Sequence, residues 1–180
     1  MGKIRFLRKG VTTHLRVLEF TDKEGITSFH RKMVEHHKID APLSKGSVCR
    51  DEVFGLPCAY CQLNKKAAET GETAPFRYRN RYLVNAVEIN VTPDKVGIWS
   101  LPATVFEMIA GAIISDEWSD VLDVKEGHAF IISRTGEGLS TEYACVPAKK
   151  TYPVTKAILD QVKDPVEVVD DPGLDVQCDE

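Results

Sequence analysis

Short runs of alternating apolar and polar side chains dominate the first part of the chain. Residues 3–7 and 14–20 carry β-branched or aromatic side chains on either side of Gly10, a pattern that predicts two strands of a hairpin. Residues 26–34 predict a third strand, and residues 77–91 predict the longest one.

Two helical patterns interrupt these strands. The first begins near Cys58 and should end at Gly71, because glycine tolerates the left-handed backbone of a helix end. The second follows Pro102, which suits a first helical turn, and places Val105, Ile109 and Ile113 on one face.

The remaining pattern is again that of strands. Residues 95–101 predict one strand, and residues 129–133 and 141–146 flank a glycine-containing turn typical of a hairpin. Many short strands with a few helices predict a mainly β fold, arranged as a small barrel.

Length and charge bound the organisation. A chain of 180 residues with 43% apolar residues can bury one good core. The net charge of -4 conceals an asymmetry, because residues 1–100 hold 17 Lys+Arg and 11 Asp+Glu (+6), whereas residues 101–180 hold 6 and 16 (-10). A locally positive region can still bind an acidic polymer.

The last residues differ in composition from the rest. Residues 164–180 are rich in Asp, Pro and Gly and bury too little apolar area to offset the entropy of ordering. We therefore expect one domain over residues 1–163 and a disordered acidic tail over residues 164–180.

No stretch of the sequence predicts a membrane or secretory segment. The longest apolar run is far shorter than the ~18 residues that span a bilayer. The residues after Met1 lack the apolar region of a secretory signal. The expected location is the cytoplasm, that of a host cell if the protein is viral.

The five cysteines predict a metal site instead of disulfides. Three of them, Cys49, Cys58 and Cys61, lie within 13 residues, and the last two form a Cys-x-x-Cys turn that can direct both sulfurs at one ion. A histidine upstream would supply the fourth ligand. His36, His37 and His30 all lie within reach, so spacing alone leaves this ligand open.

The metal is expected to be structural. Pro-Cys-x-x-Cys also occurs in zinc deaminases, but their His-x-Glu half is absent, because Lys32, Lys38 and Ile39 stand two residues after the three histidines. Four protein ligands would also close the site to water. No nucleophile, base and orienting partner can be named, so we expect no enzymatic activity and no small-molecule substrate.

Residues 77–82 read Arg-Tyr-Arg-Asn-Arg-Tyr. In a regular strand Arg77, Arg79 and Arg81 share one face, while Tyr78 and Tyr82 share the other. Guanidinium groups track phosphates, and aromatic rings stack any base, at about 1–3 kcal/mol per base. A charged, solvated strand edge is the alternative.

These features resemble the zinc-containing single-stranded DNA-binding (helix-destabilising) proteins of T-even and related bacteriophages. The resemblance runs in order from residue 3 to about residue 147. The family's His-x12-Cys spacing is reproduced by His36 and Cys49, and its following cysteine pair by Cys58 and Cys61. Its basic cluster and tyrosine-rich strand resemble residues 77–91.

The resemblance implies an OB fold of the small five-stranded type, with an inserted zinc subdomain at about residues 30–71. It implies one structural zinc ion, bound by His36, Cys49, Cys58 and Cys61. It also implies sequence-independent binding and protection of single-stranded DNA during phage replication, recombination and repair.

The residues expected to contact DNA carry a positive charge or an aromatic ring: Arg5, Arg31, Lys32, Arg77, Tyr78, Arg79, Arg81, Tyr82 and Trp99. Trp99 could equally be a filler of the core. The resemblance also implies that the acidic tail binds replication or recombination proteins, through Asp170, Asp171, Asp175, Asp179 and Glu180. The rival hypothesis is a zinc-containing protein-interaction module that binds no nucleic acid.

Overall fold

The computed structural model describes residues 4–40, 46–118 and 120–173, and the chain forms two compact units. The first unit comprises Met1–Arg31 and Tyr82–Val168, and the second comprises Lys32–Arg81 and Val169–Glu180. The protein is mainly β, with four α-helices among the described residues.

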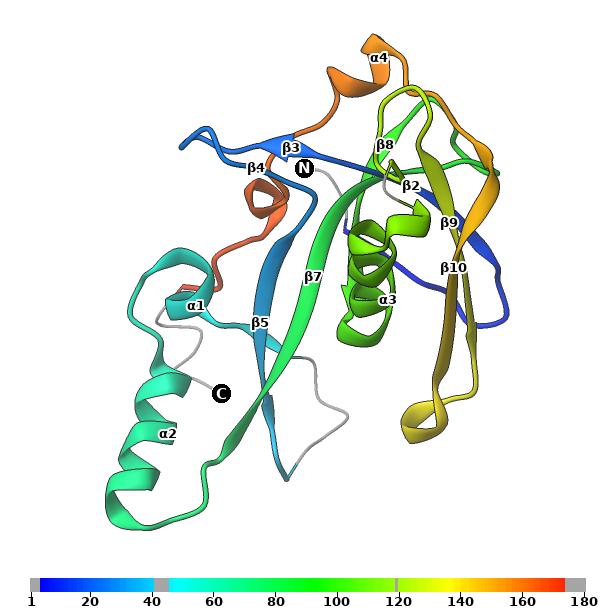
Figure 1. The fold of residues 1–180 in the computed structure, drawn as a ribbon. Coiled ribbons are helices and arrows are strands. Elements are labelled where there is room, and N and C mark those ends of the chain that lie inside the picture. The colour runs from blue at the N-terminus through cyan, green and yellow to red at the C-terminus, as the bar shows by residue number, and fades with distance from the viewer. Residues whose placement is uncertain (1–3, 41–45, 119, 174–180) are drawn as a thin grey trace. The chain divides into compact units, whose positions relative to one another are not determined.

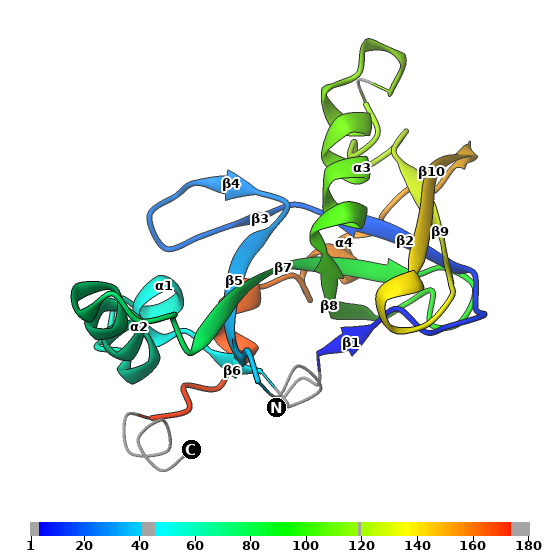
Figure 2. The same cartoon turned by 90° about the horizontal axis from the view of Figure 1, so that it is seen from below.

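A mixed sheet forms the frame of the first unit. Its strands are β1 (Arg5–Phe6), β2 (Thr13–Leu18), β7 (Phe76–Glu88), β8 (Val96–Pro102), β9 (His128–Thr135) and β10 (Glu142–Thr151). The part of β7 that precedes Tyr82 belongs to the second unit. The strands lie in the order β1-β8-β7-β2-β9-β10. Figure 1 labels all of them except β1, which is labelled in Figure 2. β1 runs parallel to β8, whereas β2 is antiparallel to both β7 and β9.

The expected hairpin between the first two strands is wrong. β1 pairs with β8, with Arg5 opposite Trp99, and β2 pairs with β7 and β9 instead. Gly10 has the positive φ of 68° that a turn glycine permits, but a turn does not decide which strand becomes the partner. The buried Leu7, which joins the main core directly after β1, favours this distant pairing.

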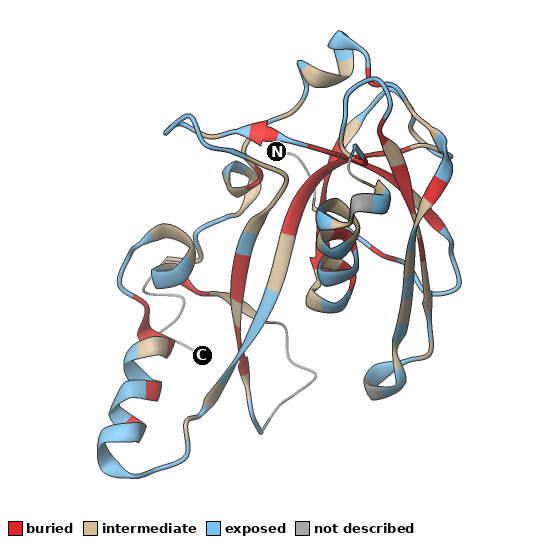
Figure 3. Ribbon diagram, in the orientation of Figure 1, coloured by how far each residue is buried: buried red, intermediate tan, exposed pale blue. Residues whose placement is uncertain are grey.

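The main core lies between the sheet and helix α3 (Ala103–Ile114), which packs on β8 and β10 (Figure 1, Figure 2). The predicted apolar face of this helix is confirmed, with Val105 and Ile109 fully buried and Ile113 partly buried against the same core. The strands β2, β7, β8 and β9 contribute most of the other buried side chains (Figure 3).

The predicted hairpin near the end of the first unit is confirmed as β9 and β10. Gly136 in its turn has φ 68°, and a Cβ there would lie 1.9 Å from the carbonyl oxygen of Ser140. Glycine is therefore required on both conformational and steric grounds.

Smaller elements complete the first unit. They are β3 (Phe20–Thr21), β4 (Thr27–Ser28), α4 (Lys156–Leu159) and the 3-10 helices η1 (Asp116–Trp118), η2 (Gly138–Ser140) and η3 (Pro165–Val168). β3 and β4 pair as a short hairpin, so two of the expected early strands are each divided.

The second unit contains β5 (Arg31–Lys38), β6 (Ser47–Val48), α1 (Arg50–Phe54) and α2 (Ala59–Thr70). β5 pairs with β6 and with β7. The prediction that Gly71 ends the helix that begins near Cys58 is confirmed for α2. Gly71 has φ 75°, and its N–H is bonded to the carbonyl of Ala67.

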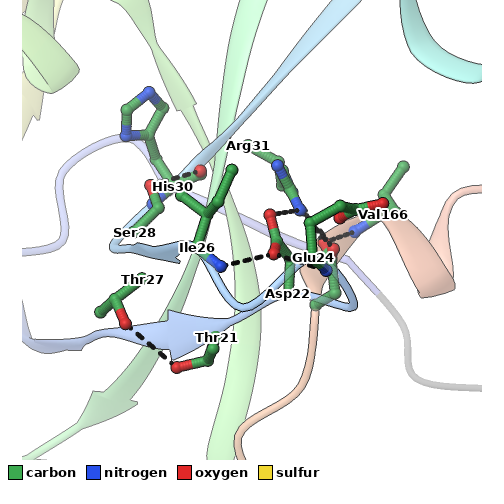
Figure 4. Close-up of polar contacts among 10 residues, drawn as sticks. Thr21, Asp22, Glu24, Ile26, Thr27, Ser28, His30, Arg31 and Val166 are labelled. Carbon is green, nitrogen blue, oxygen red and sulfur yellow. Dashed lines mark hydrogen bonds and ion pairs between the residues drawn. The ribbon is translucent and has the colours of Figure 1, made fainter.

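Arg31 is the centre of an ion-pair cluster in the first unit. Its guanidinium bonds Asp22 at 2.9 Å and Asp164 at 2.7 Å, while the Asp22 carboxylate also accepts the amides of Glu24 and Ile26 in the hairpin turn (Figure 4). Asp164 in turn accepts the amide of Val166.

The described part of the acidic tail, residues 164–173, departs from the expected disorder. It includes η3, and two of its carboxylates have arginine partners: Asp164 binds Arg31, and within the second unit Asp171 binds Arg50. Such pairs offset part of the entropy cost of ordering that composition alone predicts. Within the described ranges, no helix has the length and apolar character to cross a membrane.

Candidate functional site

Four possible metal ligands meet in the second unit. They are His36, Cys49, Cys58 and Cys61, whose ligand atoms all lie within 4.8 Å of one another. The first three are buried and Cys61 is partly buried. The set is therefore a buried Cys3His cluster that can hold one metal ion.

The distances within this cluster fit a tetrahedral ion. His36 Nε2 lies 3.4 Å from Cys58 Sγ and 3.5 Å from Cys61 Sγ, and the sulfurs of Cys49 and Cys61 are 3.6 Å apart. With a zinc–sulfur bond of about 2.3 Å, the sulfurs of a tetrahedral site stand ~3.8 Å apart. If the cysteines were only small hydrophobic side chains of a core, an imidazole nitrogen would not be expected beside their sulfurs.

Local structure positions each ligand. Cys49 is the N-cap of α1, where its sulfur accepts the amide of Glu52 and its own N–H bonds Val34 on β5. Cys58 is the N-cap of α2, and Cys61 follows one turn later on the same helix. His36 is carried by β5, opposite Ser47 in the ladder with β6.

The protonation states of this cluster reflect its burial. Burial raises the pKa of the Cys49 thiol and raises the pKa of Cys61 to about 12. Burial also opposes ionisation of Cys58, but backbone amides, that of Cys61 first, hold the pKa of Cys58 below its usual value. Burial lowers the pKa of His36, which leaves a neutral imidazole at pH 7. A bound divalent cation would supply the positive charge that three buried thiolates require.

The structure distinguishes the three candidate histidines. His36 Nε2 faces the thiols, whereas His37 is turned to Glu35, with its Nε2 3.3 Å from that carboxylate. His30 belongs to the first unit, where it contacts the aromatic rings of Phe29 and Phe106. Of the three histidines, His36 is therefore the one that the structure places with the thiols as a possible ligand.

The arginine and tyrosine residues of β7 differ in exposure. Arg77, Tyr78 and Arg79 are exposed, and Tyr78 retains 54% of its accessible surface. Arg81 is half-buried, with its Nε 3.9 Å from Glu35. Tyr82 is half-buried as well.

Tyr82 is part of an aromatic column that the sequence did not predict. Its ring stacks on Phe106 of α3, with centroids 3.7 Å apart and planes 4° apart. Phe29 lies nearly parallel to Phe106, with centroids 5.7 Å apart, and His30 is tilted against both Tyr82 and Phe106. All four side chains are partly exposed, so this column of residues 29, 30, 82 and 106 offers aromatic surface to solvent.

The remaining predicted DNA contacts are less uniform. Lys32 is exposed, whereas Arg5 contacts Thr92 and lies near Glu88, and Arg31 is neutralised by two carboxylates. Trp99 is 2% exposed in the main core, with the guanidinium of Arg5 over its ring. Of its two predicted roles, that of core filler is the one that fits.

The predicted partner-binding residues of the tail are only partly within the described ranges. Asp170 is exposed, and Asp171 receives two hydrogen bonds from Arg50, whose side chain also bonds the carbonyl of Pro57. Asp175, Asp179 and Glu180 lie outside the described residues.

These observations are typical of a nucleic-acid-binding protein that contains a structural metal site. A metal ion bound by all four ligands would have no open position for substrate or water, which is typical of a structural site. Exposed arginines before and after the exposed Tyr78 on β7 suit a nucleic acid, which carries both phosphates and flat bases.

Comparison with known families agrees with this class. A family model described as gp32 DNA binding protein like matches residues 11–171. The chain therefore belongs to the gp32-like family, which is a DNA-binding family and not an enzyme family. No curated protein matches the chain.

Proposed function

We propose that this protein binds single-stranded DNA without sequence preference and protects it during phage DNA replication, recombination and repair. The observation that carries the proposal is the run of exposed Arg77, Tyr78 and Arg79 on β7 of a chain in a DNA-binding family. Charge and stacking recognise phosphate and base faces, which all sequences share.

The aromatic column supports the same function. Partly exposed parallel rings at Tyr82 and Phe106 offer a stacking surface, because every base has a π-face. In duplex DNA those faces are already stacked, so preference for single strands follows.

We propose that the sheet is an OB fold into which a zinc subdomain of about residues 30–71 is inserted. The mainly β fold with its mixed sheet supports this, as does family membership. We further propose that the ion held by the Cys3His cluster is one structural zinc, since three thiolates and an imidazole are ligands that zinc prefers.

The acidic tail, with Asp170, Asp171, Asp175, Asp179 and Glu180, is proposed to bind replication or recombination proteins, and the protein to act in the host cytoplasm. Composition and family membership support these roles. Loss of a partner from affinity capture after truncation beyond residue 163 would test the tail.

Fluorescence anisotropy of labelled oligo(dT) tests the DNA-binding proposal. We expect unlabelled single strands of different sequence to compete within a few-fold of one another, and a duplex of the same length to compete at least about 10-fold less well. Equal competition by the duplex would contradict the single-strand proposal. Absence of any binding at low salt would favour the protein-interaction module.

A further inference from the structure

Tyr78 contacts the metal cluster while most of its surface faces solvent. Its hydroxyl donates a hydrogen bond to Cys61 Sγ, with 3.7 Å between the oxygen and the sulfur. Its ring packs against the ring of His36, with centroids 4.9 Å apart. Yet Tyr78 is 54% exposed, so one surface of the ring serves the cluster and another remains open.

The backbone around Tyr78 is tied to the same helix that carries Cys61. The Asn64 side chain on α2 donates to the carbonyl of Phe76 at 3.0 Å and accepts the amide of Phe76 at 3.1 Å. Asn64 is 9% exposed, so both bonds are shielded from water. This clamp fixes the strand two residues before Tyr78 and leaves the side chain of Tyr78 directed at the cluster.

We propose that Tyr78 is a positioning residue shared by the two sites: the metal cluster holds its ring through Cys61 and His36, and the exposed face of that ring is a preoriented platform for a DNA base. The second half of this inference rests on the proposed binding of single-stranded DNA. The metal would then act on DNA affinity through one defined side chain, beyond its role in folding.

Two physical arguments support the inference. A hydrogen bond donated to a ligand sulfur draws electron density from it, and such outer contacts tune metal sites, often by 10–100-fold in affinity. An exposed tyrosine on a strand would otherwise sample several rotamers, and fixing it beforehand removes an entropy cost from base stacking.

Cobalt substitution tests the metal half directly. The purified full chain is loaded with Co²⁺, and the sulfur-to-cobalt absorption bands and the rate of metal loss to a chelator are measured. We expect Tyr78→Phe to shift those bands and to speed metal loss by roughly 10-fold. Tyr82→Phe is the matched control for these readouts, because it removes a hydroxyl from the same strand at a ring that stacks on Phe106. Bands and rates identical to wild type in Tyr78→Phe would overturn the proposal.

Oligo(dT) titration of the zinc-loaded variants tests the DNA half. We expect Tyr78→Leu to weaken binding about 10-fold or more, because the platform is lost, and Tyr78→Phe to weaken it by about 3-fold, because the ring remains but its tether is gone. Wild-type affinity in Tyr78→Phe would overturn the link between tether and platform. If the wild-type protein binds no oligo(dT), the proposed function fails, and the contact between Tyr78 and the metal is then decided by the cobalt bands alone.

Discussion

The two units of this protein reach stability by different routes. The first has a core cluster of twelve buried side chains, all apolar, whereas the cluster of the second has four, of which two are the possible metal ligands Cys49 and Cys58. A small unit buries too little apolar surface to offset its chain entropy and needs another source of stability. Two cysteines make up half of the buried cluster of the second unit, so we expect its fold to depend on the metal ion that these thiols can bind.

Removal of one possible metal ligand should have the largest effect, and it should affect the second unit alone. Cys58→Ser should lose the metal and unfold the second unit, since structural zinc contributes on the order of 10 kcal/mol of folding free energy. Hydrogen exchange measured by mass spectrometry should show residues 46–81 losing protection while β2, β8 and β9 keep theirs. Cys145→Ser is the control, because Cys145 lies outside the cluster. Retained metal and retained protection in Cys58→Ser would contradict the account.

A cavity in the first unit should lower the stability of the protein and leave its metal content unchanged. Ile109→Ala removes a fully buried side chain of α3 and should cost about 2–5 kcal/mol of unfolding free energy. Because this core includes no ligand, metal content measured by atomic absorption should stay at one ion per chain. Parallel loss of metal and of the first unit's stability would show that the units are not distinct in the way proposed.

Removal of the exposed arginines should weaken the salt dependence of DNA binding. Arg77→Ala combined with Arg79→Ala removes two charges from the surface of β7. We expect the slope of log K against log salt for oligo(dT) to fall by about 1.4, because each lost phosphate contact releases ~0.7 fewer counterions. Lys65→Ala with Lys66→Ala is the matched control, since it removes the same charge from an exposed part of α2. An equal change of slope in both double variants would indicate a general charge effect.

The smallest expected effect concerns Asp22 in the Arg31 cluster. Turn amides, that of Ile26 first, and Arg31 hold the pKa of Asp22 below its usual value. Because this pKa is lower in the folded protein, the ionised carboxylate stabilises the fold at pH values above the ordinary aspartate pKa of about 4. This stabilisation is lost as the pH falls through the folded pKa. Asp22→Asn keeps an oxygen for the turn amides and should lower the melting temperature slightly at pH 7. The difference from wild type should vanish at acid pH, and a difference that persists there would point to a lost contact other than the ion pair.

The features that could be predicted from the sequence are mostly ones that depend on residues close together in the chain. The helix that ends at Gly71 follows from short-range chemistry, as do the apolar face of α3 and the Cys-x-x-Cys turn. His36 was singled out among three histidines by family spacing, and the structure brings it to the three thiols.

The features that the sequence missed are non-local. Nothing local to Tyr82 signals that its ring stacks on Phe106 of a helix, or that β1 lies beside β8. The ion pair between Arg31 and Asp164 joins residues 133 positions apart, so a composition rule that predicted disorder could not include it. Burial of Trp99 likewise depends on side chains from distant parts of the chain that pack in the same core.

The most direct test of the account follows oligo(dT) binding through one cycle of metal removal and return. The zinc-loaded protein is titrated, stripped with a chelator, titrated again, and titrated a third time after zinc is restored. If the metal organises the unit that carries the DNA-contacting part of β7, affinity falls by at least about 10-fold on removal and recovers with zinc. Equal affinity in the metal-free and zinc-loaded protein would contradict the account.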